Sequence, residues 1–346
     1  MSLGDLHNPK AAADMIAAFR KRFSTKVCMA PQTDHAGGTV AAHTMSLEAV
    51  LRKICTDGHV YAPNFKGRFS PDEHPLQIKR LGLRDVSVFN GFCAGHDAAL
   101  FSCLENEAFH FSRQQLFMLA YRAAARECYL KRKQCESLPE PEPEQVQAIH
   151  GLAEPFAHSE EMLIFQAASL RGAEECESFK AKLDGLLLTA SWDRFVTHAI
   201  LFPTRPSMTA CFVFQPFHDM NGQQLQDYEN LEAEMSQLAV SVLPIDQGGA
   251  AVFSWLDSAN TAPRRFFQSV LETSDLTSSV IHAVLDNSEN FALSPLWYEA
   301  LPTTTRDYLF SRIGILEASI TYSEQHRPEL AAPFLDNWGQ GSVAQF

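Results

Sequence analysis

An alternation of proline and glutamate, SLPEPEPEQ from Ser137 to Gln145, constrains this chain most, because it divides the 346 residues into two parts. Proline fixes the backbone φ angle and lacks the amide donor that a helix interior needs, and the alternating charges keep such a segment solvated. We therefore predict an extended linker over 137–149. The length also favours about two domains, one on each side of that linker.

The part before the linker is predicted to hold a metal-binding module over 1–110 and a connecting helix over 111–136. The connecting helix is indicated by apolar residues at helical spacing, interleaved with Arg and Lys, from Ser112 to Lys133. Turns and short strands are expected between shorter helices. These shorter helices are predicted over 10–23, 46–55 and 96–105.

The part after the linker, residues 150–346, is predicted to be an acidic α+β domain. A helix over 160–187 is followed by four strand-like runs, and Gln247-Gly248-Gly249 is a hairpin turn signal between the last two. We expect an antiparallel sheet with helices on one side and an irregular end over 325–346. The strands are predicted over 194–202, 208–216, 238–243 and 250–255, and further helices over 264–273, 277–286 and 304–321.

Candidate metal ligands are concentrated in the first 110 residues. Cys93 and His96 form a Cys-x-x-His pair, which a tight turn or a first helical turn can direct toward one ion. A structural Zn²⁺ needs four such ligands, so a second pair must come from upstream. Cys28 with His35 leaves His43 free for chemistry, whereas Cys28 with His43 gives a closed site that includes that histidine. Spacing alone leaves both sets open, and it is the family resemblance described next that favours Cys28, His35, Cys93 and His96.

Several separated motifs resemble those of a family of bacterial proteins in which a cysteine pair precedes a His-Thr motif. The resemblance implies that His35 takes the place of the second cysteine of that pair. The matching motifs are Ala-His-Thr (42–44), Asp-Gly-His-Val (57–60), Gly-Phe-Cys-x-x-His-Asp (91–97), Tyr-Arg-Ala (121–123) and Glu-Asn with Ser-Pro-x-Trp (289–297).

The order of these ligands is also similar to that of the HNH nucleases, which are built on a treble-clef zinc module. The resemblance implies that His43 is a general base toward water and that a second cation, Mg²⁺ or another divalent ion, is held by His59, Asp97 or Glu105. The implied substrate is DNA or RNA, and the implied setting is bacterial defence against phage. The insertion between His43 and Cys93 is longer than the nuclease motif usually contains.

Charge is distributed unevenly and bears on partners. Residues 1–134 hold 18 Lys+Arg and 12 Asp+Glu, a net +6, and residues 135–346 hold 10 and 29, a net −19. The basic first part could contact nucleic acid, while the acidic second part would repel it and is expected to bind a protein partner or a second copy of the chain. A non-catalytic, zinc-stabilised protein is therefore the competing hypothesis.

Other classes are weighed against the same residues. Cys93 or Cys55 could be a nucleophile beside His59 or His43, although Cys93 serves better as a ligand. Motifs for phosphate-binding loops, dinucleotide folds and α/β-hydrolase elbows are absent from the sequence. The scattered cysteines, the lack of a signal-like N-terminus and the lack of an apolar run of about 20 residues predict a reduced, cytoplasmic protein outside the membrane.

Overall fold

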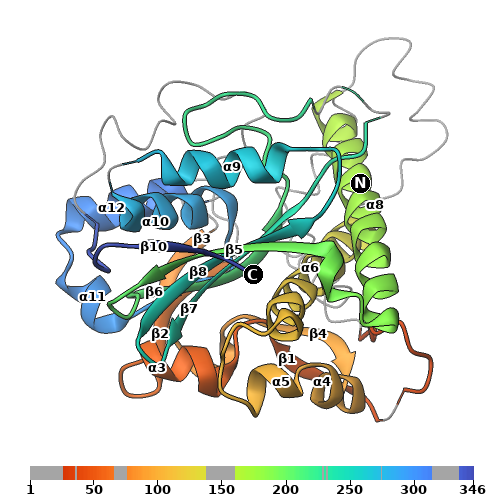
Figure 1. Ribbon diagram of the computed structural model, residues 1–346, viewed down its shortest axis with the longest axis horizontal. Coiled ribbons are helices and arrows are strands. Elements are labelled where there is room, and N and C mark those ends of the chain that lie inside the picture. Colours follow the sequence, from red (N-terminus) through yellow and green to blue (C-terminus); the bar gives the residue numbers. More distant parts are fainter. Residues whose placement is uncertain are drawn as a thin grey trace, which may run out of the picture.

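The computed structural model describes residues 26–35, 37–65, 76–137, 160–227, 230, 233–273, 275–313 and 335–346. Within these ranges the centre is an eight-stranded antiparallel sheet in the order β10-β5-β8-β7-β6-β9-β2-β3 (Figure 1). Its strands are β2 (His59–Phe65), β3 (Leu76–Gly82), β5 (Phe195–Phe202), β6 (Met208–Phe214), β7 (Leu238–Ile245), β8 (Gly248–Leu256), β9 (Phe291–Leu293) and β10 (Ser342–Gln345). The predicted α+β class with an antiparallel sheet is confirmed.

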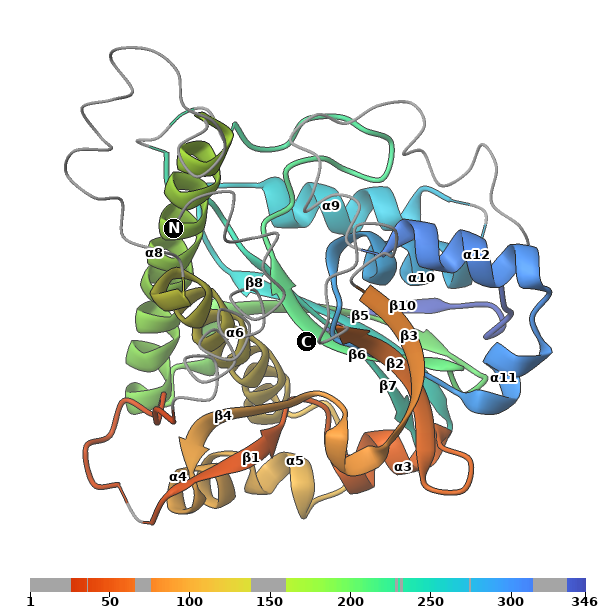
Figure 2. The ribbon, with the colours of Figure 1, turned by 180° about the vertical axis from the view of Figure 1, so that it is seen from behind.

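Helices cover both faces of this sheet (Figures 1 and 2). On one face α6 (Arg113–Ser137) packs against β6, β7 and β8, and α8 (Glu160–Thr189) packs on α6. The other face carries α9 (Ala262–Leu271), α10 (Leu276–Asn287) and α12 (Thr303–Arg312), with α11 (Pro295–Ala300) at its border. The expectation of helices on one side was therefore wrong, and the predicted connecting helix forms part of a layer.

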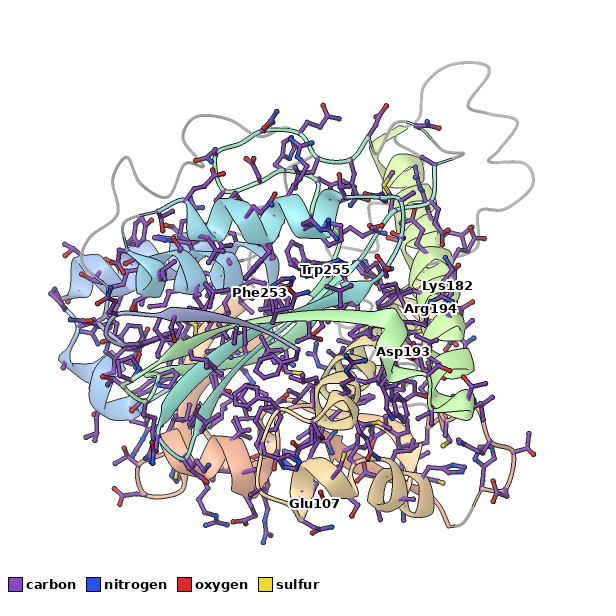
Figure 3. All side chains as sticks on the ribbon, viewed as in Figure 1. Glu107, Lys182, Asp193, Arg194, Phe253 and Trp255 are labelled. Atoms are coloured by element: carbon purple, nitrogen blue, oxygen red, sulfur yellow. The ribbon has the colours of Figure 1, made fainter. Side chains whose placement is uncertain are left out.

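The sequence of β6 explains why both faces are covered. All seven residues of this strand are buried, with no alternation between apolar and polar side chains. Cys211 and Val213 enter the core beneath α6, while Ala210 and Phe212 enter the core beneath α10. Side chains fill both spaces in Figure 3, where Phe253 and Trp255 of β8 are labelled on the α9 side.

A smaller two-stranded sheet lies beside the large one and carries the candidate ligands. β1 (Thr39–His43) pairs antiparallel with β4 (Val88–Cys93), and β4 runs directly into α4 (Ala94–Leu100) and then α5 (Ser102–Glu105). Strand β4, the turn at Cys93 and helix α4 follow one another in the order that the treble-clef prediction expects. The long connection between β1 and β4 contains a π-helical turn (Leu47–Leu51), α3 (Arg52–Ile54), β2, β3 and a short 3₁₀ turn (Leu83–Asp85).

The large sheet unites residues from both sides of the predicted linker. Tyr61 of β2 pairs with Leu293 of β9, and β9 pairs in turn with β6. The domain boundaries at 110, 136 and 149 remain predictions, but residues before 110 and residues after 149 both contribute strands to this one sheet. The predicted helix over 10–23 and the linker after Ser137 lie outside the described residues.

The turn at Gly248 was predicted from the sequence, whereas the strand near the C-terminus was not. The predicted hairpin turn is present between β7 and β8, where Gly248 has φ +102° and a Cβ atom there would meet the carbonyl oxygen of Phe202 at 2.0 Å. The expected irregular end instead contains β10, which pairs with β5. Within the described ranges, no helix has both the length and the apolar character needed to cross a membrane.

Candidate metal centre

Four potential ligands converge where the segment before β1 meets the end of β4. They are Cys28, His35, Cys93 and His96, and their ligand atoms all lie within 4.8 Å of one another. Zn²⁺ bond lengths in a tetrahedral site place ligand atoms about 3.3–3.8 Å apart. The Nδ1 atom of His96 meets this spacing, at 3.4 Å from Sγ of Cys28 and 3.3 Å from Sγ of Cys93. Binding an ion would draw the widest pair together by about 1 Å.

Local backbone geometry explains the convergence of Cys93 and His96. Cys93 is the extended residue that precedes α4, and His96 lies in the first turn of that helix, so both side chains are directed to the same side. The segment with Cys28 lies along β4, because the amide of Met29 donates to the carbonyl of Gly91 at 2.7 Å. The amide of Cys93 in turn donates to Sγ of Cys28 at 3.3 Å.

The electrostatic surroundings suit a cation. Burial raises the pKa of the Cys28 thiol, hydrogen bonds from the backbone amides of Cys93 and Ala30 oppose this rise, and the neighbouring Cys93 thiol adds to it. A bound cation would reverse this cost, because it favours the thiolate form of both ligands. On its far side, Nε2 of His96 lies 3.5 Å from a carboxylate oxygen of Asp34, the contact that commonly orients a metal-binding imidazole.

These four residues are the ligand set that the sequence analysis favours. His43, the alternative fourth ligand, does not join the cluster found among the described residues. Its Nε2 atom lies 3.2 Å from the carbonyl oxygen of Leu83, at the far end of β1. His35 is the exposed member of the set, and its ring meets that of His96 edge-on with centroids 5.3 Å apart.

The candidate catalytic residues are only partly brought together. Asp97 lies near Arg122, Glu105 and His43. Burial raises the pKa of the Asp97 carboxyl. The charges of Arg122 and His43 oppose this rise, and the charge of Glu105 adds to it. The Oδ1 atom of Asp97 is buried and has no hydrogen-bond partner among the described residues. His59, by contrast, places its Nδ1 atom 2.7 Å from its neighbour Asp57's carbonyl oxygen, at the start of β2.

Three contributors to this region were missed from the sequence. Asp34 contacts His96, Lys180 of α8 donates to the carbonyl of Met29 at 2.6 Å, and Arg122 forms an ion pair with Glu105 at 2.7 Å. Only the position of Asp34, next to His35, offered a local signal. Lys180 and Arg122 reach their partners through the packing of α6 and α8, which no spacing along the chain indicates.

Comparisons with known proteins add no relative. No protein-family model, no curated protein and no solved structure matches this chain. The interpretation therefore depends on the geometry of the chain itself.

Proposed function

We propose that this is a zinc-binding protein in which Zn²⁺ has a structural role, held by Cys28, His35, Cys93 and His96. Two sulfur and two nitrogen ligands form a set typical of structural zinc, and four protein ligands leave no open position for water. The observation that carries the proposal is the clustering of all four ligand atoms within 4.8 Å. The ion would fasten the segment at Cys28 to the junction between β4 and α4.

Metal analysis of matched cysteine variants tests this role. The wild-type chain should retain one zinc per chain after gel filtration, and Cys93→Ser should lose it together with thermal stability. Cys55→Ser is the matched control, because Cys55 is half-buried, lies outside the cluster and, within the described ranges, donates its thiol to the carbonyl of Arg52. Equal zinc content in the two variants, or a wild-type melting temperature unchanged by a zinc chelator, would overturn the proposal.

A second candidate is metal-dependent hydrolysis of a phosphodiester in DNA or RNA. It is favoured by one observation, the buried and unpartnered Oδ1 of Asp97 close to His43. In this reaction His43 would take a proton from water, the resulting hydroxide would attack phosphorus, and the P–O bond to the leaving sugar would break. Asp97 would help to hold Mg²⁺ or another divalent ion that stabilises the developing charge. Defence against phage is the setting that the analogy with the HNH nucleases suggests.

The nuclease candidate is tested with the zinc-loaded chain. DNA and RNA are incubated with it in Mg²⁺, Mn²⁺ or Ni²⁺, alongside His43→Ala and the control His110→Ala, which alters an exposed histidine. Loss of cleavage in the first variant alone, with zinc retained, supports it. Absence of cleavage by the zinc-loaded wild type would rule out the nuclease candidate. The non-catalytic alternative, in which the acidic second part binds a protein partner, would then remain.

A further inference from the structure

The two cysteines of the candidate metal centre lie side by side but differ in exposure. Cys28 is half-buried, whereas Cys93 is only 2% exposed. Their sulfur atoms lie at most 4.8 Å apart, and the amide of Cys93 donates to Sγ of Cys28 at 3.3 Å. A disulfide holds its sulfur atoms at about 2.0 Å, so they must approach by up to about 3 Å, which rotations about the two Cα–Cβ bonds can supply. One thiol can therefore meet a small solute from water, and the second is in place to react with the first.

Contacts that do not involve an ion hold the Cys28 segment against β4. The amide of Met29 donates to the carbonyl of Gly91 at 2.7 Å, and Lys180 donates to the carbonyl of Met29 at 2.6 Å. These contacts keep the two sulfur atoms adjacent when an ion leaves. His35 is the exposed member of the ligand set, so its bond to an ion is open to water.

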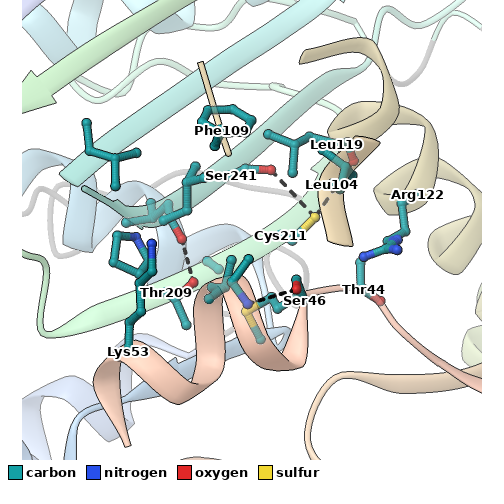
Figure 4. A pocket seen from close by; sticks show the side chains of 18 of the residues that line it. Thr44, Ser46, Lys53, Leu104, Phe109, Leu119, Arg122, Thr209, Cys211 and Ser241 are labelled. Atoms are coloured by element: carbon teal, nitrogen blue, oxygen red, sulfur yellow. Dashed lines mark hydrogen bonds between the residues drawn. The ribbon is translucent and has the colours of Figure 1, made fainter. Parts of the chain in front are cut away.

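Cys211 is a buried thiol in a different setting. It lines a cavity between the large sheet and the first part of the chain, and its Sγ accepts a hydrogen bond of 3.5 Å from the hydroxyl of Ser241 (Figure 4). The Cys211 thiol lies 3.8 Å from the carbonyl oxygen of Leu119, to which it donates. Among the described residues that line this cavity there is no second thiol. Oxidation at Cys211 would therefore find no partner there for a disulfide.

We propose that the metal centre is a peroxide-sensitive switch, in which hydrogen peroxide joins Cys28 to Cys93 and expels the zinc ion. This inference rests on the structural zinc proposed above. The sulfur of Cys28 attacks one oxygen of the peroxide, so that an S–O bond forms, the O–O bond breaks and hydroxide leaves. The sulfur of Cys93 then attacks Sγ of Cys28, so that the S–S bond forms, the S–O bond breaks and a second hydroxide leaves.

The peroxide is the only oxidant that this reaction requires. The two thiolates lose two electrons in total, the peroxide gains both, and the two hydroxide ions take up protons to become water. Since the disulfide offers no thiolate, Zn²⁺ is left with two imidazole ligands and dissociates. The disulfide joins the same two segments that the ion joined, so the oxidised chain should stay folded. A thiol reductant with added Zn²⁺ should then restore the centre.

The test treats the full, zinc-loaded chain with a stoichiometric amount of hydrogen peroxide. A chromophoric chelator measures the zinc released, and mass spectrometry after alkylation and trypsin digestion locates the disulfide. We expect equal amounts of released zinc and of a cross-link between peptides 27–52 and 85–113, which contain Cys28 and Cys93. The second peptide also contains Cys103, so Cys103→Ser is treated in parallel and should retain the cross-link. Cys55→Ser is the matched control and should release zinc as the wild type does.

The order of the two steps is tested with single variants. Cys93→Ser lacks the second thiol, so Cys28 should stop at the sulfenic acid, which dimedone labels. In Cys28→Ser the buried Cys93 should be labelled about tenfold more slowly, because oxidation follows exposure. Equal labelling of the two variants would overturn this order. The cross-link in the wild type decides the proposal even if both variants fail to fold.

The outcomes separate the switch from the structural zinc on which it rests. Zinc that is retained after treatment, or released without the Cys28–Cys93 cross-link, overturns the switch and leaves the structural role standing. Loss of the native circular dichroism on oxidation also overturns the switch. A chain that binds no zinc before treatment overturns both.

Discussion

The ammonium group of Lys180 donates a hydrogen bond of 2.6 Å to the carbonyl oxygen of Met29, the residue that follows the candidate ligand Cys28. Lys180 is 4% exposed and also donates to the hydroxyl of Tyr121 at 3.0 Å and to Asp184 at 2.6 Å. Burial lowers the pKa of Lys180, and the Asp184 carboxylate opposes that change. Three acceptors thus hold the buried ammonium group, which links α8 to the segment that carries Cys28.

Replacing Lys180 tests this link. We expect Lys180→Met to lower the free energy of unfolding by about 1–3 kcal/mol, because the Met29 carbonyl and Asp184 lose a charged donor. Zinc should also be lost to a chelator faster than from the wild type. Lys182→Met is the control, since Lys182 lies on the same helix but is exposed, and its ion pair with Glu234 is a surface pair. Urea unfolding measures both variants, and equal losses would contradict the link.

Histidine variants separate the two ligand sets. His35→Ala should lower the affinity for zinc at least tenfold, because one of the four coordinate bonds is removed. A tenfold loss corresponds to about 1.4 kcal/mol of binding free energy. His43→Ala should keep its zinc, since its ring contacts the carbonyl of Leu83. Competition with a chromophoric chelator measures both affinities. The reverse ranking would favour the set that contains His43.

The buried histidine of α10 predicts a dependence of stability on pH. Burial, aided by the positive charge of Arg312, lowers the pKa of His282 to about 4 from its ordinary 6.5, while Asp275 opposes the change. As the pH falls, the unfolded chain therefore takes up a proton at His282 before the folded chain does. The contribution of neutral His282 to the free energy of unfolding is complete above pH 6.5 and is lost as the pH falls toward 4. The loss attributable to His282 is at most about 3 kcal/mol. Its ring also bonds the hydroxyl of Tyr308 at 2.8 Å.

The measurement is urea unfolding from pH 7.5 to pH 4.5, compared with His282→Gln. The variant keeps a polar side chain but has no proton to gain, so its stability should fall less over this interval. Asp286 faces the same region and titrates in both proteins, so the difference between the two curves isolates the histidine. Parallel curves would contradict the prediction.

A buried ion pair joins α10 to α12. Arg312 donates to Asp286 through both Nε, at 2.7 Å, and Nη2, and both side chains are at most 5% exposed. Arg312→Met should cost about 3–5 kcal/mol because it leaves Asp286 buried without its partner. The double variant with Asp286→Leu should recover most of this loss. Calorimetric unfolding gives the comparison, and an unchanged melting temperature in the single variant would refute it.

The shared sheet predicts how fragments behave. Residues 1–136 and 150–346, produced separately, should each fail to unfold cooperatively, because β2 pairs with β9 and α6 covers β6 and β7. Circular dichroism melts and NMR dispersion measure this for each fragment and for the mixture. Two independently folded fragments would show that the predicted boundaries do separate domains.

Local patterns in the sequence predicted the Cys/His cluster and most elements of this fold. Cys93 and His96 are three residues apart at the start of a helix, and such a relation is set by a single turn of backbone. The four strand runs and the turn at Gly248 are likewise short-range signals.

The sheet partners could not be predicted in the same way. β9 has only three residues, and β10 lies in a stretch without a strand pattern, so each is a strand because an existing edge offers it hydrogen bonds. Lys180 and Met29 are 151 residues apart in the sequence. Their hydrogen bond is strong because it is buried, and the burial exists only once the layers have assembled, so no local pattern predicts it.

Because Tyr61 pairs with Leu293, strand β2 cannot find its partner β9 until most of the chain has been synthesised. About 230 residues separate these partners, so a ribosome adding about 5–20 residues each second takes about ten to fifty seconds to deliver the second strand. Through that interval the nascent β2–β3 hairpin shows an unsatisfied edge to its surroundings, which makes early chaperone capture advantageous for this chain.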